Sequence, residues 1–450
     1  MGVVRRLDLA YERQSMSTAP SATNVGVNVR LAVMMFIQFF IWGAWYVTVG
    51  NYMGKIGLGK EIYWAYTVGP IAAIISPFFL GMVADRYFST ERVLGVLHLL
   101  GGIAIFAAPV VAGGESASGF LFISLLLVHM LCYMPTLGLT NTLAFHHITN
   151  SEYWFPLIRV FGTLGWIVAG TVVSKVFQAD ESPLPLQIAG GAGLLMGLYS
   201  FSLPHTPSAA KGKKPNFAEI SGLAALVKLG SPSFWIFIIS SLLICIPLSA
   251  YYAYAPVFVN ALGIENPGFK MSFGQWAEVV FMLAMPFFFR VLGIKWMLFV
   301  GMLAWVVRYA LFSMAAEESV LWMIIGGILL HGICYDFFFV TGQIYVDKKS
   351  TPEIRGQAQG FLVLLTLGVG MLIGSIVSGQ LFNAIVPVIE NPTAAQTAQI
   401  LSGWKTFWMI PTVGAAVIMV LFAVLFKDDS RASGLSKGDA ARAAAAEEQP

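Results

Sequence analysis

Residues 117–147 read ASGFLFISLLLVHMLCYMPTLGLTNTLAFHH and contain no Asp, Glu, Lys or Arg. The hydrocarbon core of a bilayer is about 30 Å thick and is crossed by about 20 apolar residues in an α-helix, so this stretch is long enough to span it. A strand of a membrane β-barrel would be about ten residues long and would alternate apolar with polar side chains. The stretch therefore predicts a transmembrane helix.

The composition of the whole chain agrees with this prediction. Hydrophobic residues make up 57% of the 450 residues and charged residues 11%, whereas about 25% are charged in ordinary globular proteins. The 26 Lys and Arg and 23 Asp and Glu are too few to cover a water-soluble surface. We expect an integral membrane protein in contact with the lipid bilayer. The net charge of +3 argues against nucleic acid as a partner, because a phosphate-binding face needs a dense basic cluster.

Comparable stretches recur along the chain and predict an all-α membrane protein with twelve transmembrane helices. They cover roughly 30–53, 60–84, 92–112, 117–147, 154–179, 184–203, 231–262, 272–294, 295–314, 319–346, 356–387 and 403–426. The longest polar break, 204–230, is expected to be a cytoplasmic linker between two six-helix bundles, 30–203 and 231–427. Residues 1–29 and 428–450 are expected to form a cytoplasmic extension and a cytoplasmic tail.

Lys and Arg gather in the segments that an even helix count places on the same side as the termini. Examples are Arg5 and Arg6 near the start and Lys213 and Lys214 in the linker. The positive-inside rule then places both termini in the cytoplasm, in a multi-pass protein of the cytoplasmic (inner) membrane. The first residues lack the apolar core of a signal peptide, and Met16 offers a second start.

Two short segments suggest that the six-helix unit is repeated. His129-Met-Leu-Cys132-Tyr133 in the fourth helix is echoed 202 residues later by His331-Gly-Ile-Cys334-Tyr335 in the tenth. A six-helix unit repeated in the same orientation resembles the layout of the major facilitator superfamily. In that fold the substrate site lies between the two halves, near the middle of the membrane.

The segment after the second expected helix also resembles that superfamily. It reads Gly81-Met-Val-Ala-Asp85-Arg86-Tyr-Phe88, which is similar to the family's cytoplasmic signature, although Phe88 stands where the family has a glycine. The resemblance implies that Asp85 and Arg86 take part in gating. The alternative is an ordinary helix end followed by a charged turn.

Three ionisable residues lie deep inside expected helices: Arg159, Glu278 and Asp336. Each would cost roughly 2.5–3.5 kcal/mol at the bilayer centre, so we expect all three to face inward and to meet one another. Lys175 and Arg308 lie nearer helix ends, where a long side chain can reach the membrane surface, and they are expected to be structural.

Polar and aromatic residues share helix faces with these charges. Arg159, Thr163 and Trp166 are spaced i, i+4 and i+7 on one face, and Gln275 and Glu278 are spaced i and i+3. His331 and Tyr335 share a face beside Asp336. The set suits a neutral ligand that offers hydroxyls to bind and a flat ring to stack. Each polar residue alone could instead hydrogen-bond between helices.

Enzymatic chemistry has little support in the sequence. The pair His146 and His147 has no third ligand nearby, so no metal site is expected. A phosphate-binding loop for ATP is absent from the sequence. These observations favour a secondary transporter, without a cofactor, that is driven by an ion gradient. Glu278 and Asp336 are the candidate groups for carrying the proton.

Several longer motifs resemble the nucleoside:proton symporter family of major facilitators. They are Trp42-Gly43-Ala-Trp45, Tyr133-Met-Pro-Thr-Leu-Gly-Leu-Thr-Asn-Thr, Ile158-Arg159-Val-Phe-Gly162-Thr163-Leu-Gly165, Met285-Pro286-Phe-Phe, Tyr335-Asp336-Phe337-Phe338 and Ile354-Arg355-Gly-Gln-Ala358-Gln359-Gly360. The resemblance runs from about 29 to 427 and implies proton-driven nucleoside uptake by alternating access. It also implies that Arg159, Thr163, Gln275, Glu278 and Asp336 bind substrate.

The chain departs from that family at several binding positions. Trp166 replaces a phenylalanine, and His331 and Tyr335 replace a tyrosine and a phenylalanine. On the seventh helix, Leu248 and Tyr251 stand where the family has a glutamine and an asparagine. The range of accepted nucleosides is therefore left open. So are a permease for another hydroxylated solute, such as a sugar or a nucleobase-like compound, and a nucleoside receptor that does not transport.

The resemblance implies a cycle in which Glu278 or Asp336 takes a proton from outside before the nucleoside enters. The ribose would be bound by a carboxylate and Arg159, and the base by Gln275 and an aromatic ring. Which carboxylate carries the proton is left open, because coupled groups can share it. Each chain contains both halves of the site, so a monomer is expected to suffice.

Overall fold

The protein is described here by a computed structural model that covers residues 25–79, 87–112, 118–149, 151–208, 229–351, 354–389 and 391–430. Regular structure in these ranges is entirely helical. The gating residues Asp85 and Arg86 lie outside the described residues. So do most of the expected N-terminal extension, linker and C-terminal tail.

Residues 25–208, here called the first half, contain the helices of the first expected bundle. They are α2 (Val25–Trp45), α3 (Val49–Lys55), η1 (Gly59–Glu61), α4 (Ile62–Phe79), α6 (Thr90–Ala112), α7 (Gly119–His147), α8 (Ser151–Gly170), η3 (Thr171–Val176) and α9 (Leu184–Ser200). The charge-free stretch that predicted a transmembrane helix forms α7. Its first turn is capped by the Ser118 hydroxyl, which accepts a hydrogen bond of 3.2 Å from the Leu121 N–H.

Residues 229–430, the second half, contain the remaining helices. They are α12 (Pro232–Ala261), α13 (Pro267–Met271), α14 (Phe273–Ala315), α15 (Leu321–Leu329), α16 (His331–Tyr335), η4 (Asp336–Val340), α17 (Thr341–Lys349), α18 (Arg355–Val363), η5 (Leu364–Gly370), α19 (Met371–Ile385) and α20 (Ala394–Leu425). The last helix begins earlier than the expected 403. Thr393 and Gln396 form a reciprocal capping box that starts it at Ala394.

Ten helical stretches of the described chain are long and apolar enough to cross a membrane. One of them, Pro267–Ala315, is 49 residues long and covers two expected helices, 272–294 and 295–314. Gly293 interrupts it with φ 67° and ψ −179°, a conformation that is essentially restricted to glycine. The expected helix 184–203 forms α9, which has 17 residues and is not among the ten.

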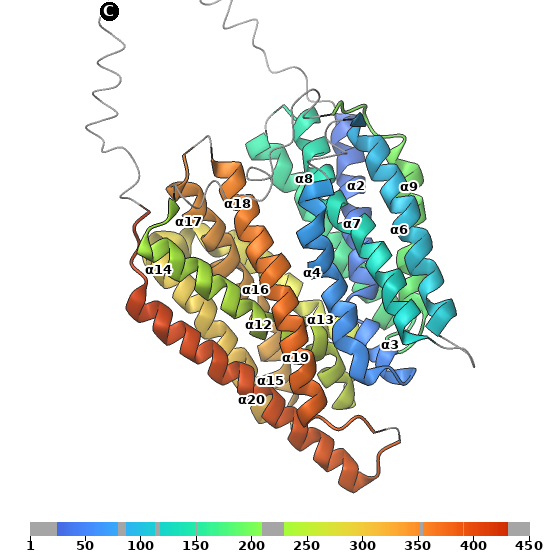
Figure 1. Ribbon diagram of the computed structural model, residues 1–450, viewed down its shortest axis with the longest axis vertical. Helices are drawn as coiled ribbons and strands as arrows, with labels where there is room; N and C mark the ends of the chain where they lie inside the picture. The colour runs from blue at the N-terminus through green and yellow to red at the C-terminus, as the bar shows by residue number, and fades with distance from the viewer. Residues whose placement is uncertain are drawn as a thin grey trace, which may run out of the picture.

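The two halves lie side by side, with the first half, from blue α2 to green α9, next to the second half, from yellow-green α12 to red α20 (Figure 1). Described hydrogen bonds between the halves join Asp180 to Gly268, Glu181 to Asn260, Lys60 to Asn383 and Tyr66 to Ser375. Asp180, Glu181 and Lys60 belong to the connections that follow η3 and α3. We call this end of the molecule the gate end. The other end, where α8 begins and α17 ends, is called the terminal end.

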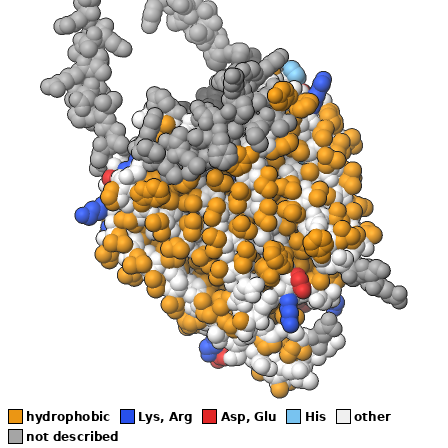
Figure 2. Space-filling model, viewed as in Figure 1, with side chains coloured by type: hydrophobic (Ala, Val, Ile, Leu, Met, Phe, Trp, Pro, Cys, Tyr) orange, Lys and Arg blue, Asp and Glu red, His pale blue; other side chains and the backbone are white. Residues whose placement is uncertain are grey.

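Apolar side chains cover most of the outer face that Figure 2 presents, and the visible charged side chains lie toward its two ends. Large exposed residues on this kind of surface include Phe120, Leu283 and Val424, whose exposed fractions are 85%, 79% and 72%. Exposed apolar area of this extent would be unfavourable in water. This surface is suited to a multi-pass membrane protein.

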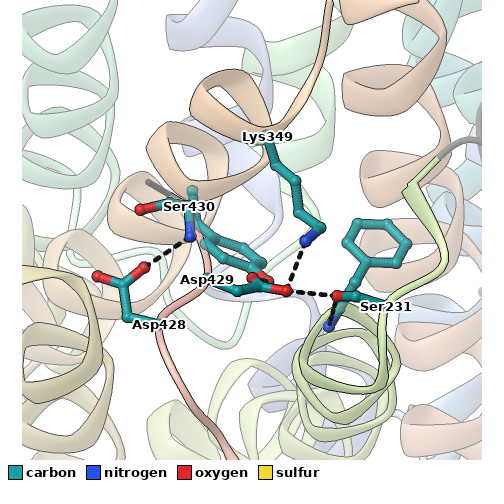
Figure 3. A network of polar contacts seen from close by, with 7 residues as sticks. Ser231, Lys349, Asp428, Asp429 and Ser430 are labelled. Carbon is teal, nitrogen blue, oxygen red and sulfur yellow. Dashed lines mark hydrogen bonds and ion pairs between the residues drawn. The ribbon is translucent and has the colours of Figure 1, made fainter. Parts of the chain in front are cut away.

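At the terminal end, Asp429 connects three helices of the second half (Figure 3). Its carboxylate accepts hydrogen bonds from Lys349 Nζ at 2.6 Å, Ser231 Oγ at 2.5 Å and Tyr345 Oη at 2.7 Å. Burial acts to raise the pKa of Asp429, but these bonds, first that from Lys349, outweigh burial and lower the pKa below its ordinary value. The contact secures the end of α17 to the start of α12.

Candidate functional site

The face of α8 that carries Arg159 points toward the second half. Arg159, Thr163 and Trp166 are each partly exposed along it, as their helical spacing predicts. The Arg159 guanidinium carbon lies 4.0 Å from the ring centroid of Phe39 in α2. Its charge interacts with Tyr335 and Glu278 of the second half. The first half therefore presents a cation, a hydroxyl and an indole ring toward the second.

The opposing face belongs to α14, where Gln275 and Glu278 are both partly exposed. A close approach between α14 and α16 places Glu278 beside the residues of the tenth expected helix. A Cβ on Gly332 would lie 2.5 Å from the carbonyl carbon of Ala277 and 2.6 Å from the Glu278 nitrogen, so only glycine fits there. This contact brings the Glu278 and Asp336 carboxyl groups close enough to interact electrostatically.

The tenth expected helix, 319–346, is not a uniform α-helix. Asp336 begins η4, a π-helical segment that ends at Val340. Such segments inside α-helices are frequent at functional sites. Asp336 is 0% exposed, and neither of its carboxylate oxygens has a hydrogen-bond partner among the described residues. It lies behind the partly exposed Tyr335 rather than on the open face.

The three deep charges approach one another without forming an ion pair. No nitrogen–oxygen distance of 4.0 Å or less joins Arg159 to Glu278 or to Asp336 within the described ranges. Arg159 interacts with Glu278, and Glu278 with Asp336, through their charges at longer range. The expected meeting of these groups is therefore an electrostatic interaction at longer range and not a direct ion pair.

Aromatic rings connect the two faces across the boundary between the halves. The Trp166 ring centroid lies 6.3 Å from that of Tyr46, Tyr46 lies 6.0 Å from Tyr252, and Tyr252 lies 5.9 Å from His331. His331 in turn lies 5.9 Å from Tyr335. Tyr46 and Tyr252 were not singled out from the sequence. The sequence offered one signal for each: Tyr46 directly follows the motif Trp42-Gly-Ala-Trp45, and Tyr252 lies one helical turn after Leu248. Many tyrosines of an apolar chain have such neighbours, so this signal is weak.

His331 has a buried partner behind it. The ring of His331, which is 2% exposed, stacks on Tyr251 at 5.2 Å. On helix α12, Leu248 and Tyr251 are each only 1% exposed, whereas Tyr252 is partly exposed. Leu248 and Tyr251, which stand where the family has a glutamine and an asparagine, are therefore enclosed. The neighbouring Tyr252 lies nearer to the open face.

The expectation that Arg308 reaches the membrane surface is wrong. Arg308 is 0% exposed and its guanidinium carbon lies 4.0 Å from the ring centroid of Tyr251. Its Nε donates a 3.0 Å hydrogen bond to the Gly327 carbonyl, while Nη1 and Nη2 have no partner among the described residues. Packing between α14 and α15 encloses Arg308. The distance of a residue from the end of its helix does not reveal such packing. Lys175, by contrast, is exposed, as expected.

A buried polar network holds the aromatic residues of the first half in place. Gln38 donates a 2.8 Å hydrogen bond to Thr136 and pairs with His98 at 2.8 Å. Tyr133 donates a 2.7 Å bond to the Gln38 carbonyl, and its ring lies 5.6 Å from that of Trp42. Satisfied networks of this kind rigidify their surroundings. Trp42 in turn lies 5.6 Å from Trp166 of the site.

Metal binding finds no support in the described part of the chain. No group of three or more His, Cys, Asp or Glu there could hold a metal ion. His147 instead pairs with the Thr206 hydroxyl at 2.9 Å. A surface pocket near this pair, lined by Thr142, Phe145 and His146 among others, lies at the terminal end, away from the inter-half residues.

Comparison with known proteins shows what this arrangement is similar to. A family profile described as "Nucleoside H+ symporter" matches residues 25–431. The YegT protein of Escherichia coli (strain K12) is 38% identical over 89% of this chain and 93% of its own length. Nucleoside permease NupG of the same organism is 31% identical over 90% of this chain and 96% of its own length.

Solved structures agree with these relatives. A crystal structure of the nucleoside transporter NupG, in an aspartate-to-alanine mutant form, superimposes with a TM-score of 0.80 at 28% identity. It covers 89% of this chain and 100% of that one. A D-xylose–proton symporter superimposes with a TM-score of 0.67 at 10% identity, which indicates a shared fold alone.

Proposed function

The chain belongs to the nucleoside H+ symporter family, and we propose that it couples uptake of a nucleoside to entry of a proton by alternating access between its two halves. It is a multi-pass membrane permease and not an enzyme. The named relatives take nucleosides, and this chain presents groups that suit one. These are a cation, carboxyl groups, an amide and several aromatic rings.

The observation that carries the proton-coupling proposal is the carboxyl group of Asp336. A charge on it is fully buried and has no partner among the described residues to offset the loss of water. The partly exposed Glu278 lies within electrostatic reach. We infer that the two groups exchange the transported proton, since two negative charges this close are unfavourable together. Proton release and nucleoside release are then linked through Glu278, which faces Arg159.

The proposed binding residues divide between the halves. Arg159, Thr163 and Trp166 of the first half face Gln275, Glu278, His331 and Tyr335 of the second. In this assignment the ribose hydroxyls bind Arg159 and Glu278, and the base binds Gln275 and lies against an aromatic ring. A ligand held from both sides favours the arrangement in which the halves close on it, which is the physical basis of coupling.

We further propose the full twelve-helix major facilitator layout with two repeated six-helix bundles, 30–203 and 231–427. The ten long apolar stretches become twelve when Pro267–Ala315 is divided at Gly293 and α9 is counted. Lipid surrounds the apolar outer face, both termini face the cytoplasm of the inner membrane, and the monomer transports without a cofactor. Asp85 and Arg86, which lie outside the described residues, would act in gating on the cytoplasmic side.

The test is uptake of radiolabelled uridine and adenosine by cells that lack their own nucleoside permeases, with and without a protonophore. Expressing cells should accumulate nucleoside above the external concentration, and the protonophore should abolish accumulation. Competition by unlabelled uridine but not by free ribose would identify the nucleoside as the substrate. Inhibition by free ribose or a sugar would support the permease for another hydroxylated solute. Binding of nucleoside without any uptake would support a receptor.

A further inference from the structure

Tyr46 of the first half and Tyr252 of the second form a ring contact across the boundary between the halves. Their centroids lie 6.0 Å apart with an interplanar angle of 62°, an edge-to-face arrangement that aromatic rings favour. Tyr46 occupies the break between α2 and α3, and Tyr252 lies about two thirds of the way along α12. The pair therefore joins the two bundles at the depth of the proposed site.

Each ring of this pair also touches a proposed binding residue of its own half. Tyr46 lies 6.3 Å from Trp166, and Tyr252 lies 5.9 Å from His331. The Tyr252 hydroxyl also lies in the neighbourhood of Tyr335 and of the Glu278 carboxyl group. The two tyrosines thus sit between the residues that each half is proposed to offer to the nucleoside.

The hydroxyl groups of the pair are available. Neither the Tyr46 nor the Tyr252 hydroxyl makes a hydrogen bond to a described residue, although Tyr46 is only 7% exposed. Unlike the hydroxyls of Tyr251 and Tyr254, they are not fully enclosed by protein atoms. A buried hydroxyl without a partner is costly, whereas one that bonds a ligand recovers that cost. Tyr46 is held in position because its carbonyl accepts a 2.9 Å hydrogen bond from Tyr66.

The pair exists because the halves are in contact at the gate end. The Gly268 N–H donates a 3.0 Å hydrogen bond to Asp180, and the Lys175 ammonium lies 4.7 Å from the Phe269 ring. Both contacts join the halves beyond the tyrosine pair. A motion that separates the halves at this end would also part the Tyr46 and Tyr252 rings.

We propose that Tyr46 and Tyr252 bind the transported nucleoside directly, through their hydroxyls and ring faces, and that closure of the gate end assembles them into one binding surface. The inference rests on the proposed nucleoside transport and adds two specificity-determining residues to it. Hydroxyl donors suit the hydroxyls and carbonyls of a nucleoside, and a ring can stack on its base.

The experiment measures uridine uptake kinetics for wild type, Tyr46→Phe, Tyr252→Phe and Tyr254→Phe, with each rate divided by the amount of protein in the membrane. Tyr254 is the matched control. It lies on the same helix, its hydroxyl also lacks a partner, and its ring stacks at 4.5 Å on Phe382, within the second half. We expect Tyr46→Phe and Tyr252→Phe to raise KM roughly 2- to 10-fold at unchanged maximal rate, the range that one lost hydrogen bond gives. Tyr254→Phe should match wild type.

A second measurement guards against variants that transport poorly for other reasons. Tyr252→Cys should react with a membrane-permeant maleimide more slowly when uridine is present, and free ribose at the same concentration should give no such protection. If wild type transports uridine while both Phe variants keep its KM, or if uridine gives Tyr252→Cys no protection, the inference is overturned. If wild type neither transports nor binds uridine, the proposed function itself fails.

Discussion

At the scale of single residues, Glu278 and Asp336 are two carboxyl groups in different surroundings. Glu278 is partly exposed and interacts with the Arg159 charge, whereas Asp336 is enclosed at the start of a π-helical segment. In the proposed function, Glu278 is therefore the group that meets substrate and Asp336 the group that holds a proton away from it. This difference depends on burial, and the spacing of residues along a helix does not reveal burial.

Asp336→Asn should abolish accumulation of nucleoside above the external concentration and leave the exchange of labelled for unlabelled nucleoside intact. Asparagine is nearly isosteric and cannot carry a proton through the cycle, while exchange needs only movement of the loaded halves. Uptake and counterflow in vesicles with an imposed pH gradient measure the two activities. Wild-type accumulation at equal expression would contradict the assignment.

At the scale of elements, α14 shows how one glycine divides a long apolar stretch. The segment Pro267–Ala315 is far longer than a bilayer requires, and the chain must turn within it. Gly293 provides the turn through its positive φ, and no described atom lies within 4 Å of the place where a Cβ would be. Glycine is therefore required here by the backbone conformation and not by a lack of space for a side chain.

Gly293→Ala should destabilise the protein by about 1–3 kcal/mol, because alanine is strained at this φ and ψ. The melting temperature of the purified protein in detergent measures the effect. Gly414→Ala in α20 is the matched control. A Cβ there also meets nothing within 4 Å, and alanine is favoured by up to about 1 kcal/mol inside a helix. Equal melting temperatures for the two variants would show that a side chain at position 293 causes no strain.

At the scale of the whole molecule, the described hydrogen bonds between the halves involve the gate end and the middle. Of the two acidic residues in this group, Asp180 is the enclosed one, being 7% exposed, whereas Glu181 is exposed. It accepts hydrogen bonds from the Ser174 hydroxyl at 2.7 Å and from the Gly268 N–H. Burial raises the pKa of Asp180 above its ordinary value, although both hydrogen bonds act against it. If the halves part here, the carboxyl becomes solvated.

The contact between the halves at Asp180 should weaken as the pH rises. The pKa is raised in the closed state, so closure takes up protons; its contribution is complete at low pH and is lost as the pH rises through the raised value. Asp180→Ala should open the gate end further, since the hydrogen bond of about 1 kcal/mol that joins the halves at Gly268 is lost. Asp180→Asn keeps an acceptor for Gly268 and removes the titration.

The readout is labelling of Thr48→Cys by a membrane-impermeant maleimide. Thr48 is 2% exposed and packs at this contact. We expect faster labelling with Asp180→Ala at a fixed pH. The labelling rate with Asp180 intact, divided by the rate with Asp180→Asn, should rise with pH. Since both measurements use the same thiol, its own titration cancels. A ratio that is independent of pH would contradict the role of Asp180.

Some of the arrangement of the candidate site was accessible from spacing alone. Arg159, Thr163 and Trp166 share the face of α8 that their periodicity predicts, and Gln275 and Glu278 share the face of α14. Arg308 was misjudged, because its burial depends on packing between α14 and α15. Tyr46 and Tyr252 were missed, because their proximity arises only when two helices about 200 residues apart in the chain come together.

The sequence by itself determined the class of molecule, its family and three of the deep charges, Arg159, Glu278 and Asp336, but not the buried Arg308. Stretches this long without charges are suited to lipid, and a charge within one is costly unless it faces the interior of the protein. Only the tertiary structure decided which groups are enclosed and which are open, and which rings meet across the halves. Burial and inter-half contact depend on how helices distant in the chain pack, and local periodicity contains no information on that packing.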